Sequence, residues 1–141
     1  MIPFLDTSAL VKRYVSEKGS DTVRSLFRRG RPAVVRIAYA EVASALGRLW
    51  RAGRVAEDAM RVAIEQLDDD FGMMQVVEVR TALVRRVPAL VMARPLRAYD
   101  AVQLAAALAL RDQGAAVQFW TADKKLAESA RSEDLRATLL S

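Results

Sequence analysis

Short apolar runs of strand-like composition alternate with longer segments of helical periodicity along the whole chain of 141 residues. The predicted strands are residues 2–5, 33–37, 73–79 and 115–120, with a weaker candidate at 135–139. The predicted helices are residues 8–15, 20–29, 39–51, 56–71, 80–92, 96–111 and 123–131, and Pro88 should kink or split the fifth. This alternation is typical of a sheet covered by helices on both faces. The sequence therefore predicts one α/β domain over residues 1–141, a three-layer α/β/α sandwich with a mostly parallel central sheet of four to five strands.

Four acidic residues are expected at one edge of this sheet. Asp6 follows the first predicted strand, and Asp123 comes soon after the strand that ends at Trp120. Glu41 and Asp100 lie in the opening turns of two predicted helices. In a parallel sheet, ligands bind beyond the carboxyl ends of the strands. We therefore expect these four side chains to converge on a common site.

Three of these acids also have a structural explanation. Asp6 could cap the helix that follows it, because an aspartate accepts hydrogen bonds from the free N–H groups there. Glu41 and Asp100 could complement the positive end of a helix dipole, and Asp100 could pair with Arg97. However, the helix around Asp100 is apolar on nearly every face, and no basic residue stands three or four positions later. A carboxylate buried there must be paired, protonated or bound to metal.

The lack of histidine and cysteine narrows the chemistry of such a site. The chain has His 0 and Cys 0, which excludes Ser–His and Cys–His catalysis and any nitrogen or sulfur side-chain ligand for zinc. A metal would have oxygen ligands, which favours Mg²⁺ or Mn²⁺. Clustered carboxylates repel one another unless they share protons or cations, and two divalent ions can activate water against a phosphodiester. The net charge of +5 suits a polyanion such as RNA or DNA.

The sequence shows no sign of a membrane segment or a secretory signal. No apolar stretch approaches the roughly 18 residues of a membrane span. The beginning of the chain lacks a basic region and carries an acid at Asp6. We therefore expect a cytoplasmic protein with no membrane partner.

Several other side chains have less specific interpretations. Four basic residues flank the predicted edge as candidate RNA-phosphate contacts, although ordinary surface charge explains them as well: Lys12, Arg13, Arg36 and Arg97. The three aspartates at 68–70 are expected to form a solvated helix terminus. Three aromatic side chains are expected in the core: Trp50, Phe71 and Phe119.

The chain contains four notable stretches in order: FLDTSALVKRY, AYAEVASALGRL, LRAYDAVQLAAALA and FWTADKKLAESA. Together they resemble the PIN-domain ribonucleases and, within them, the VapC-like toxins of toxin–antitoxin pairs. The resemblance extends over nearly the whole chain. It implies a catalytic, metal-holding set and two supporting hydroxyls: Asp6, Glu41, Asp100 and Asp123, with Ser8 and Thr121. One departure is Gln103, which stands where many relatives have histidine, outside the acidic set.

The resemblance implies a Mg²⁺- or Mn²⁺-dependent endoribonuclease that hydrolyses RNA phosphodiester bonds. Members of the family are silenced by a cognate antitoxin and commonly form homodimers, so both are expected partners here. Other families fit less well: a phosphoaspartyl phosphatase would have an aspartate in place of Ser8, and a dinucleotide-binding domain would have a glycine-rich turn after the first strand. The alternative that stays open is a non-catalytic domain of the same fold that binds nucleic acid or a protein partner.

Overall fold

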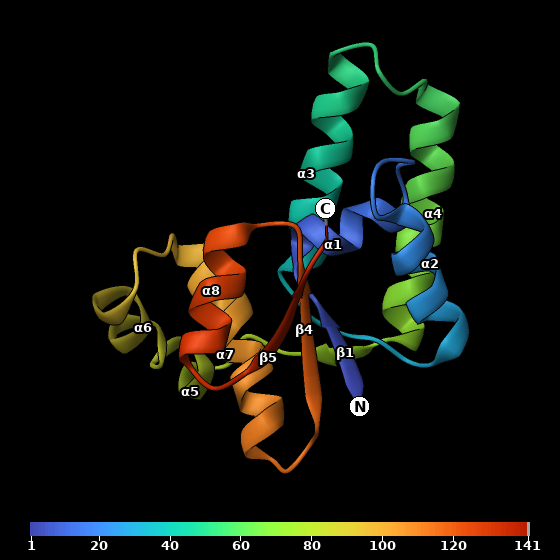
Figure 1. Cartoon of the computed structure of the whole chain (residues 1–141). Coiled ribbons are helices and arrows are strands. Elements are labelled where there is room, and N and C mark those ends of the chain that lie inside the picture. The colour runs from blue at the N-terminus through green and yellow to red at the C-terminus, as the bar shows by residue number, and fades with distance from the viewer. Residues whose placement is uncertain (141) are drawn as a thin grey trace.

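The computed structural model of the chain describes residues 1–140 and contains a five-stranded sheet (Figure 1). The strands are β1 (Ile2–Leu5), β2 (Ala33–Val35), β3 (Gln75–Val77), β4 (Val117–Thr121) and β5 (Arg136–Leu139). They pair in the order β3-β2-β1-β4-β5, and every pairing is parallel. The predicted parallel sheet is confirmed, and the weak strand candidate at 135–139 corresponds to β5.

β1 and β4 pair in parallel at the centre of the sheet. Phe4 and Phe119 are register partners, both are fully buried, and their rings stack with centroids 5.6 Å apart. Leu5, the last residue of β1, is paired with Trp120. Because the two strands end at the same level of the sheet, Asp6 and the residues after β4 begin at the same edge.

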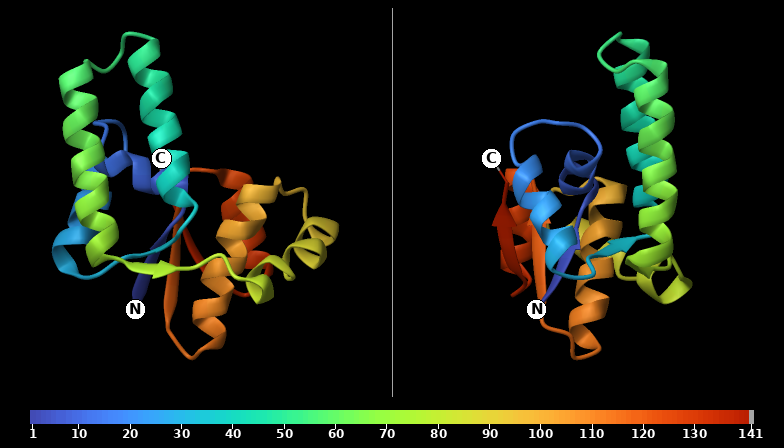
Figure 2. Two further views of the ribbon diagram at one scale, coloured as in Figure 1. Left: turned by 180° about the vertical axis from the view of Figure 1, so that it is seen from behind. Right: turned by 90° about the vertical axis from the view of Figure 1, so that its right-hand side faces the viewer.

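Helices cover both faces of the sheet. They are α1 (Thr7–Leu10), α2 (Ser20–Arg29), α3 (Ala38–Arg51), α4 (Glu57–Met73), α5 (Thr81–Val84), α6 (Val87–Ala93), α7 (Ala98–Asp112) and α8 (Lys124–Ser132), with a 3₁₀ turn η1 (Val11–Arg13). α7 and α8 lie on one side of the strands and α2 lies on the other (Figures 1 and 2). The predicted three-layer arrangement is thus confirmed. Within residues 1–140, none of the helices has both the length and the apolar character needed to cross a membrane.

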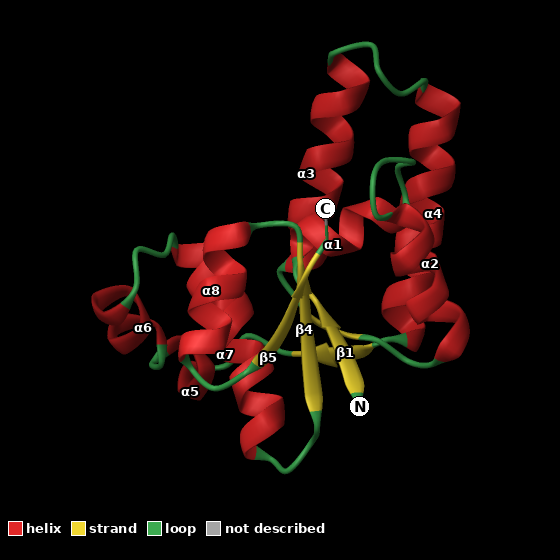
Figure 3. Cartoon of the chain, in the orientation of Figure 1, coloured by secondary structure: helices red, strands yellow, loops and turns green. Residues whose placement is uncertain are grey.

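Two of the predicted helices are interrupted. The segment predicted as a helix at 8–15 forms α1 and then tightens into η1, and the segment at 80–92 is divided into α5 and α6 (Figure 3). Pro88 lies in the first turn of α6. A proline is tolerated there because the first N–H groups of a helix have no partner within the helix. The predicted effect of Pro88 is confirmed as a split.

α3 and α4 form a helical hairpin that projects beyond the rest of the molecule (Figures 1 and 2). Trp50 lies near the end of α3 and is 41% exposed, so its predicted place in the core is wrong. Phe71, near the base of α4, is buried, and so is Phe119. The buried apolar residues of the hairpin lie toward the start of α3 and the end of α4.

The aspartates at 68–70 are not uniformly solvated. Asp70 is 3% exposed, although Asp68 and Asp69 are exposed as predicted. The Asp70 carboxylate accepts hydrogen bonds from Arg13 Nε at 2.7 Å and Nη2 at 3.1 Å, and from the Tyr14 hydroxyl at 2.7 Å. A buried charge is tolerated only when it is paired and hydrogen-bonded. Asp70 therefore joins α4 to the turn after β1.

Candidate active site

The four predicted acids line one cavity of about 310 Å³ at the carboxyl edge of the sheet. Each reaches it from a different element. Asp6 follows β1, Glu41 lies in the first turn of α3, Asp100 lies in the first turn of α7, and Asp123 is the N-cap residue of α8. The structure therefore brings together residues that are up to 117 positions apart in the sequence, because their helices all begin at this edge.

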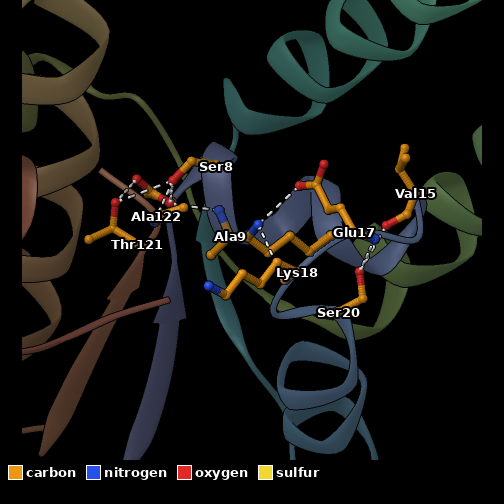
Figure 4. Close-up of polar contacts among 10 residues, drawn as sticks. Ser8, Ala9, Val15, Glu17, Lys18, Ser20, Thr121 and Ala122 are labelled. Atoms are coloured by element: carbon orange, nitrogen blue, oxygen red, sulfur yellow. Dashed lines mark hydrogen bonds and ion pairs between the residues drawn. The ribbon is translucent and has the colours of Figure 1, made fainter. Parts of the chain in front are cut away.

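Asp6 is held by a network of hydrogen bonds and is only 3% exposed. Its Oδ1 accepts from the Ser8 hydroxyl at 2.8 Å and from the Ala9 N–H at 2.9 Å, and its Oδ2 accepts from the Thr121 hydroxyl at 2.6 Å. Figure 4 shows the Ser8 and Thr121 side chains in this network, with Ala9 and Ala122 beside them. The Ala122 N–H donates to Ser8 Oγ at 2.8 Å. Asp6 thus caps α1 and lines the acid cavity as well.

Burial raises the pKa of Asp6 to about 6, from 3.8 for an ordinary aspartate. The hydrogen bonds from Thr121, Ala9 and Ser8 act in the opposite direction, because they stabilise the carboxylate form. The negative charge of Asp100 raises the pKa further. Buried acids with a raised pKa that lie in a cavity are candidates for functional sites.

Glu41 is oriented by Thr7 and Gln103. Its Oε1 accepts from the Thr7 hydroxyl at 2.8 Å and from Gln103 Nε2 at 3.0 Å, and Nε2 also donates to Thr7 Oγ1 at 2.8 Å. Gln103 is 2% exposed, and its Oε1 is buried without a hydrogen-bond partner in the described chain. Sequence reasoning placed Gln103 outside the acidic set and did not identify Thr7. The structure assigns both to the support of Glu41.

Asp100 has a different environment. It is half-buried, and no donor within residues 1–140 forms a hydrogen bond with its carboxylate. Burial raises its pKa, the charges of Asp123 and Glu41 raise it further, and the charge of Arg97 lowers it. Pairing with Arg97 was one structural explanation for this acid, but no ion pair between them exists in the described residues. Asp100 therefore lines the cavity without a fixed protein partner.

Asp123 combines a structural role with its place in the cavity. Its Oδ1 accepts from the N–H groups of Lys125 at 2.9 Å and Leu126 at 3.2 Å, which caps α8. The Asp123 N–H donates to Thr121 Oγ1 at 3.0 Å. Thr121 therefore connects the backbone at Asp123 with the carboxylate of Asp6.

The side chains of the cavity suit a hard divalent cation. The acids offer only oxygen atoms, which Mg²⁺ and Mn²⁺ prefer. The charge of Asp100 raises the pKa of Asp6, and the charges of Asp123 and Glu41 raise the pKa of Asp100, so a cation between these acids would relieve repulsion. Within residues 1–140, however, no three acidic side chains are already arranged around a common metal position. The donor chemistry of the cavity fits a divalent cation.

The predicted phosphate contacts have varied surroundings. Lys12 is buried and donates to Glu17 Oε1 at 3.1 Å and to the carbonyl oxygen of Lys18 at 2.6 Å. Arg13 is bound to Asp70, as described above. Neither side chain lines the acid cavity, and the contacts of both stabilise the fold. Arg36 Nη2 forms an ion pair with Glu78 Oε2 at 2.7 Å.

Arg48 is a basic residue of the cavity that sequence reasoning missed. It is exposed, and its Nη1 donates to Ser44 Oγ at 3.0 Å. Arg48 follows Glu41 by seven positions, so the two side chains lie on one face of α3, two turns apart. That spacing was the available signal in the sequence.

Comparison with known proteins agrees with this geometry. The family model described as PIN domain matches residues 4–132. Ribonuclease VapC45 of Mycobacterium tuberculosis (strain CDC 1551 / Oshkosh) is 32% identical over 134 residues, which cover 94% of this chain and 92% of the relative. The family match extends from β1 to α8, and all four acids of the cavity lie within it.

Solved structures share the fold at low sequence identity. VapBC2 from Rickettsia felis, bound to a DNA fragment from its promoter, has a TM-score of 0.69 at 15% identity and covers 100% of both chains. VapC20 of Mycobacterium tuberculosis, described as a sarcin-ricin loop cleaving toxin, has a TM-score of 0.65 at 16% identity, with 90% of this chain and 94% of that chain covered. The chain belongs to the PIN-domain family, and within it is similar to the proteins named ribonuclease VapC.

Proposed function

We propose that this chain is a metal-dependent endoribonuclease that hydrolyses RNA phosphodiester bonds and acts as the toxin of a toxin–antitoxin pair. The observation that carries the proposal is the convergence of four acids, from four separate elements, on one cavity. Membership of the PIN-domain family and similarity to ribonuclease VapC45 support the same function.

The proposed metal ligands are the four carboxylates of the cavity: Asp6, Glu41, Asp100 and Asp123. Bound Mg²⁺ or Mn²⁺ would supply a more acidic water and stabilise the charge on the phosphodiester oxygens. The chain itself orients the ligands. Ser8 and Thr121 hold Asp6, while Thr7 and Gln103 occupy Oε1 of Glu41 and leave its Oε2 without a hydrogen bond in the described chain. Asp100, which no donor holds, is the ligand that can reorient most freely.

The proposed substrate is RNA, a polyanion that a chain of net charge +5 attracts. Arg48 lines the acid cavity and is the best-placed phosphate contact. Arg97 and Arg36 stay candidates beside it, because both are exposed. Phosphate contacts of this kind position the nucleic acid without reading its sequence.

The proposed partners are a cognate antitoxin and a second copy of the chain. Similar solved structures include a toxin–antitoxin complex from Klebsiella pneumoniae and the VapBC2 structure described above. An acidic cavity is complementary to a cationic side chain, and arginine binds carboxylates through two parallel hydrogen bonds. We therefore expect the antitoxin to place an arginine or lysine among the four acids.

The proposal is tested by RNA cleavage with and without divalent metal. The purified chain should cleave RNA only when Mg²⁺ or Mn²⁺ is present, and Asp100→Asn should abolish cleavage because it removes a ligand charge. Asp69→Asn, an exposed acid outside the cavity, is the matched control and should remain active.

Full cleavage in excess EDTA, or an active Asp100→Asn protein, would overturn the metal-dependent assignment. If the parent chain binds RNA but never cleaves it with either metal, the non-catalytic alternative of the same fold is correct.

A further inference from the structure

A second cavity, of about 570 Å³, is lined mainly by apolar and aromatic side chains. They are Ile37, Tyr39, Ala40, Val79, Tyr99 and Val102. Arg36 also contributes to the lining. Sites for small ligands commonly have volumes of roughly 300–1,000 Å³. The cavity is thus large enough for an aromatic ring system of the size of a nucleobase.

This apolar cavity and the acid cavity are built from the same helical turns. Three pairs of sequence neighbours divide between them: Ala40 and Glu41, Tyr99 and Asp100, Val102 and Gln103. Successive residues of a helix are only 1.5 Å apart along its axis, although their side chains point in different directions. The two cavities therefore flank the first turns of α3 and α7. A polymer bound at the acids would have to pass close to one of these turns.

The surface at the apolar cavity combines exposed aromatic area with positive charge. Tyr99 is 58% exposed, and Val79 is also exposed. Arg97, two residues before Tyr99, is exposed and forms no ion pair within residues 1–140. Arg36 is exposed as well but is paired with Glu78, while Arg48 lies on the side of the acids, so Arg97 is the unpaired cation beside the apolar cavity within residues 1–140. Aromatic rings among basic side chains are typical of surfaces that bind single-stranded nucleic acid.

We propose that the apolar cavity binds a nucleobase of single-stranded RNA, with the Tyr99 ring as a stacking surface, next to the phosphodiester held at the acids. The inference rests on the proposed ribonuclease function and adds to it a site for the flanking nucleotide. Stacking on an aromatic ring accepts any base, since every base has a flat π face. The cavity therefore sets a requirement for an unpaired base and not for one particular sequence.

The experiment measures binding of a short fluorescein-labelled RNA of mixed sequence, in EDTA so that metal-dependent cleavage does not interfere. Tyr99→Ala should weaken binding roughly tenfold, as expected for loss of one base–aromatic stack. Tyr99→Phe keeps the ring and should bind as the parent does. Trp50→Ala removes another exposed aromatic residue, one that lines neither cavity, and should leave the affinity unchanged.

A series of RNAs, each with one abasic nucleotide, then locates the stacked base. At one position, loss of the base should weaken RNA binding to the parent about tenfold. The same abasic RNA should bind Tyr99→Ala as tightly as the intact RNA binds Tyr99→Ala. Independent, additive losses at every position would overturn the proposal. So would a change of oligomeric state in Tyr99→Ala without this coupling, because the surface would then be an interface between copies of the chain.

The test separates this inference from the proposed function. Coupling between Tyr99 and one base, found in a chain that never cleaves RNA with Mg²⁺ or Mn²⁺, would support the base site and contradict the ribonuclease. Cleavage without coupling would support the ribonuclease and contradict the base site.

Discussion

Asp6 shows, at the scale of a single residue, that a structural role and a functional role can coincide. The sequence presented a helix cap and a site residue as alternatives, and the structure shows the cap together with a place in the acid cavity. Strand ends made Asp6 and Asp123 predictable. The hydrogen bonds that hold Glu41 could not be predicted from the sequence. Gln103 contacts Thr7 across 96 positions, and no local pattern encodes that contact.

The charge of Asp6 should make the metal-free protein less stable as the pH rises. Between 3.8 and about 6 the folded state holds a proton that the unfolded chain has lost, so the free energy of unfolding falls through this window. The total effect is about 3 kcal/mol. Asp6→Asn keeps an oxygen that can accept from the Ala9 N–H and should lack this decrease. Urea unfolding of both proteins across the window measures it.

The same pair of proteins tests metal binding without any RNA. Mn²⁺ should raise the melting temperature of the parent, because only the folded state holds the site, and Asp6→Asn should lose most of that increase. An Asp6→Asn protein that is less stable than the parent in EDTA at neutral pH, yet responds fully to Mn²⁺, would reduce Asp6 to a helix cap.

Gln103 should affect the site through Glu41. Gln103→Met keeps a similar volume but removes both donors to Glu41 and Thr7, so we expect metal affinity to fall roughly tenfold, as is usual for residues that orient ligands. The measurement is the Mn²⁺ concentration that gives half of the maximal thermal stabilisation. Gln113→Met is the control, because Gln113 is the exposed C-cap residue of α7, the helix that contains Gln103. Equal responses of the two variants would show that Gln103 only fills space.

At the scale of the elements, the spacing of apolar residues and the positions of helix- and strand-breaking residues predicted most of the fold. α2 (Ser20–Arg29) and β1 (Ile2–Leu5) were predicted with the same limits, and the other elements differ mainly by a few residues at their ends. The failure at Asp70 has a physical cause. A run of acids at a helix end is normally solvated, but Arg13, 57 positions earlier, folds back onto this one.

The Asp70 contact should contribute strongly to the attachment of α4. Asp70→Asn leaves the Arg13 guanidinium without its counter-charge in a partly buried position, and breaking such a pair costs about 3 kcal/mol. Asp69→Asn, next to it and exposed, should change stability by less than about 0.5 kcal/mol. Urea unfolding measures both. A full Mn²⁺ response in Asp70→Asn would show that the loss concerns the fold alone, whereas a loss of that response would mean that α4 also shapes the acid cavity.

At the scale of the whole molecule, an acidic cavity lies within a basic chain. The net charge of +5 favours association with RNA even without metal, while the four acids weaken phosphate binding at the centre of the cavity until metal is bound. Composition therefore predicted the class of partner, but it could not show which of the 22 basic residues face the cavity. That distinction depends on folding, which places Arg48 at the acids and binds Arg13 to Asp70.

Salt dependence of RNA binding distinguishes a specific phosphate contact from net charge. Each phosphate contact to single-stranded RNA contributes about 0.7 to the slope of log affinity against log salt concentration. Arg48→Gln should lower the slope by that amount, because its guanidinium lies at the cavity where the backbone passes. Arg28→Gln, an exposed residue of α2 outside both cavities, removes the same charge and should leave the slope unchanged. Titrations of labelled RNA in EDTA at several salt concentrations supply the slopes. If the two variants reduce the slope equally, RNA responds to the total charge of the chain, and Arg48 has no special contact with it.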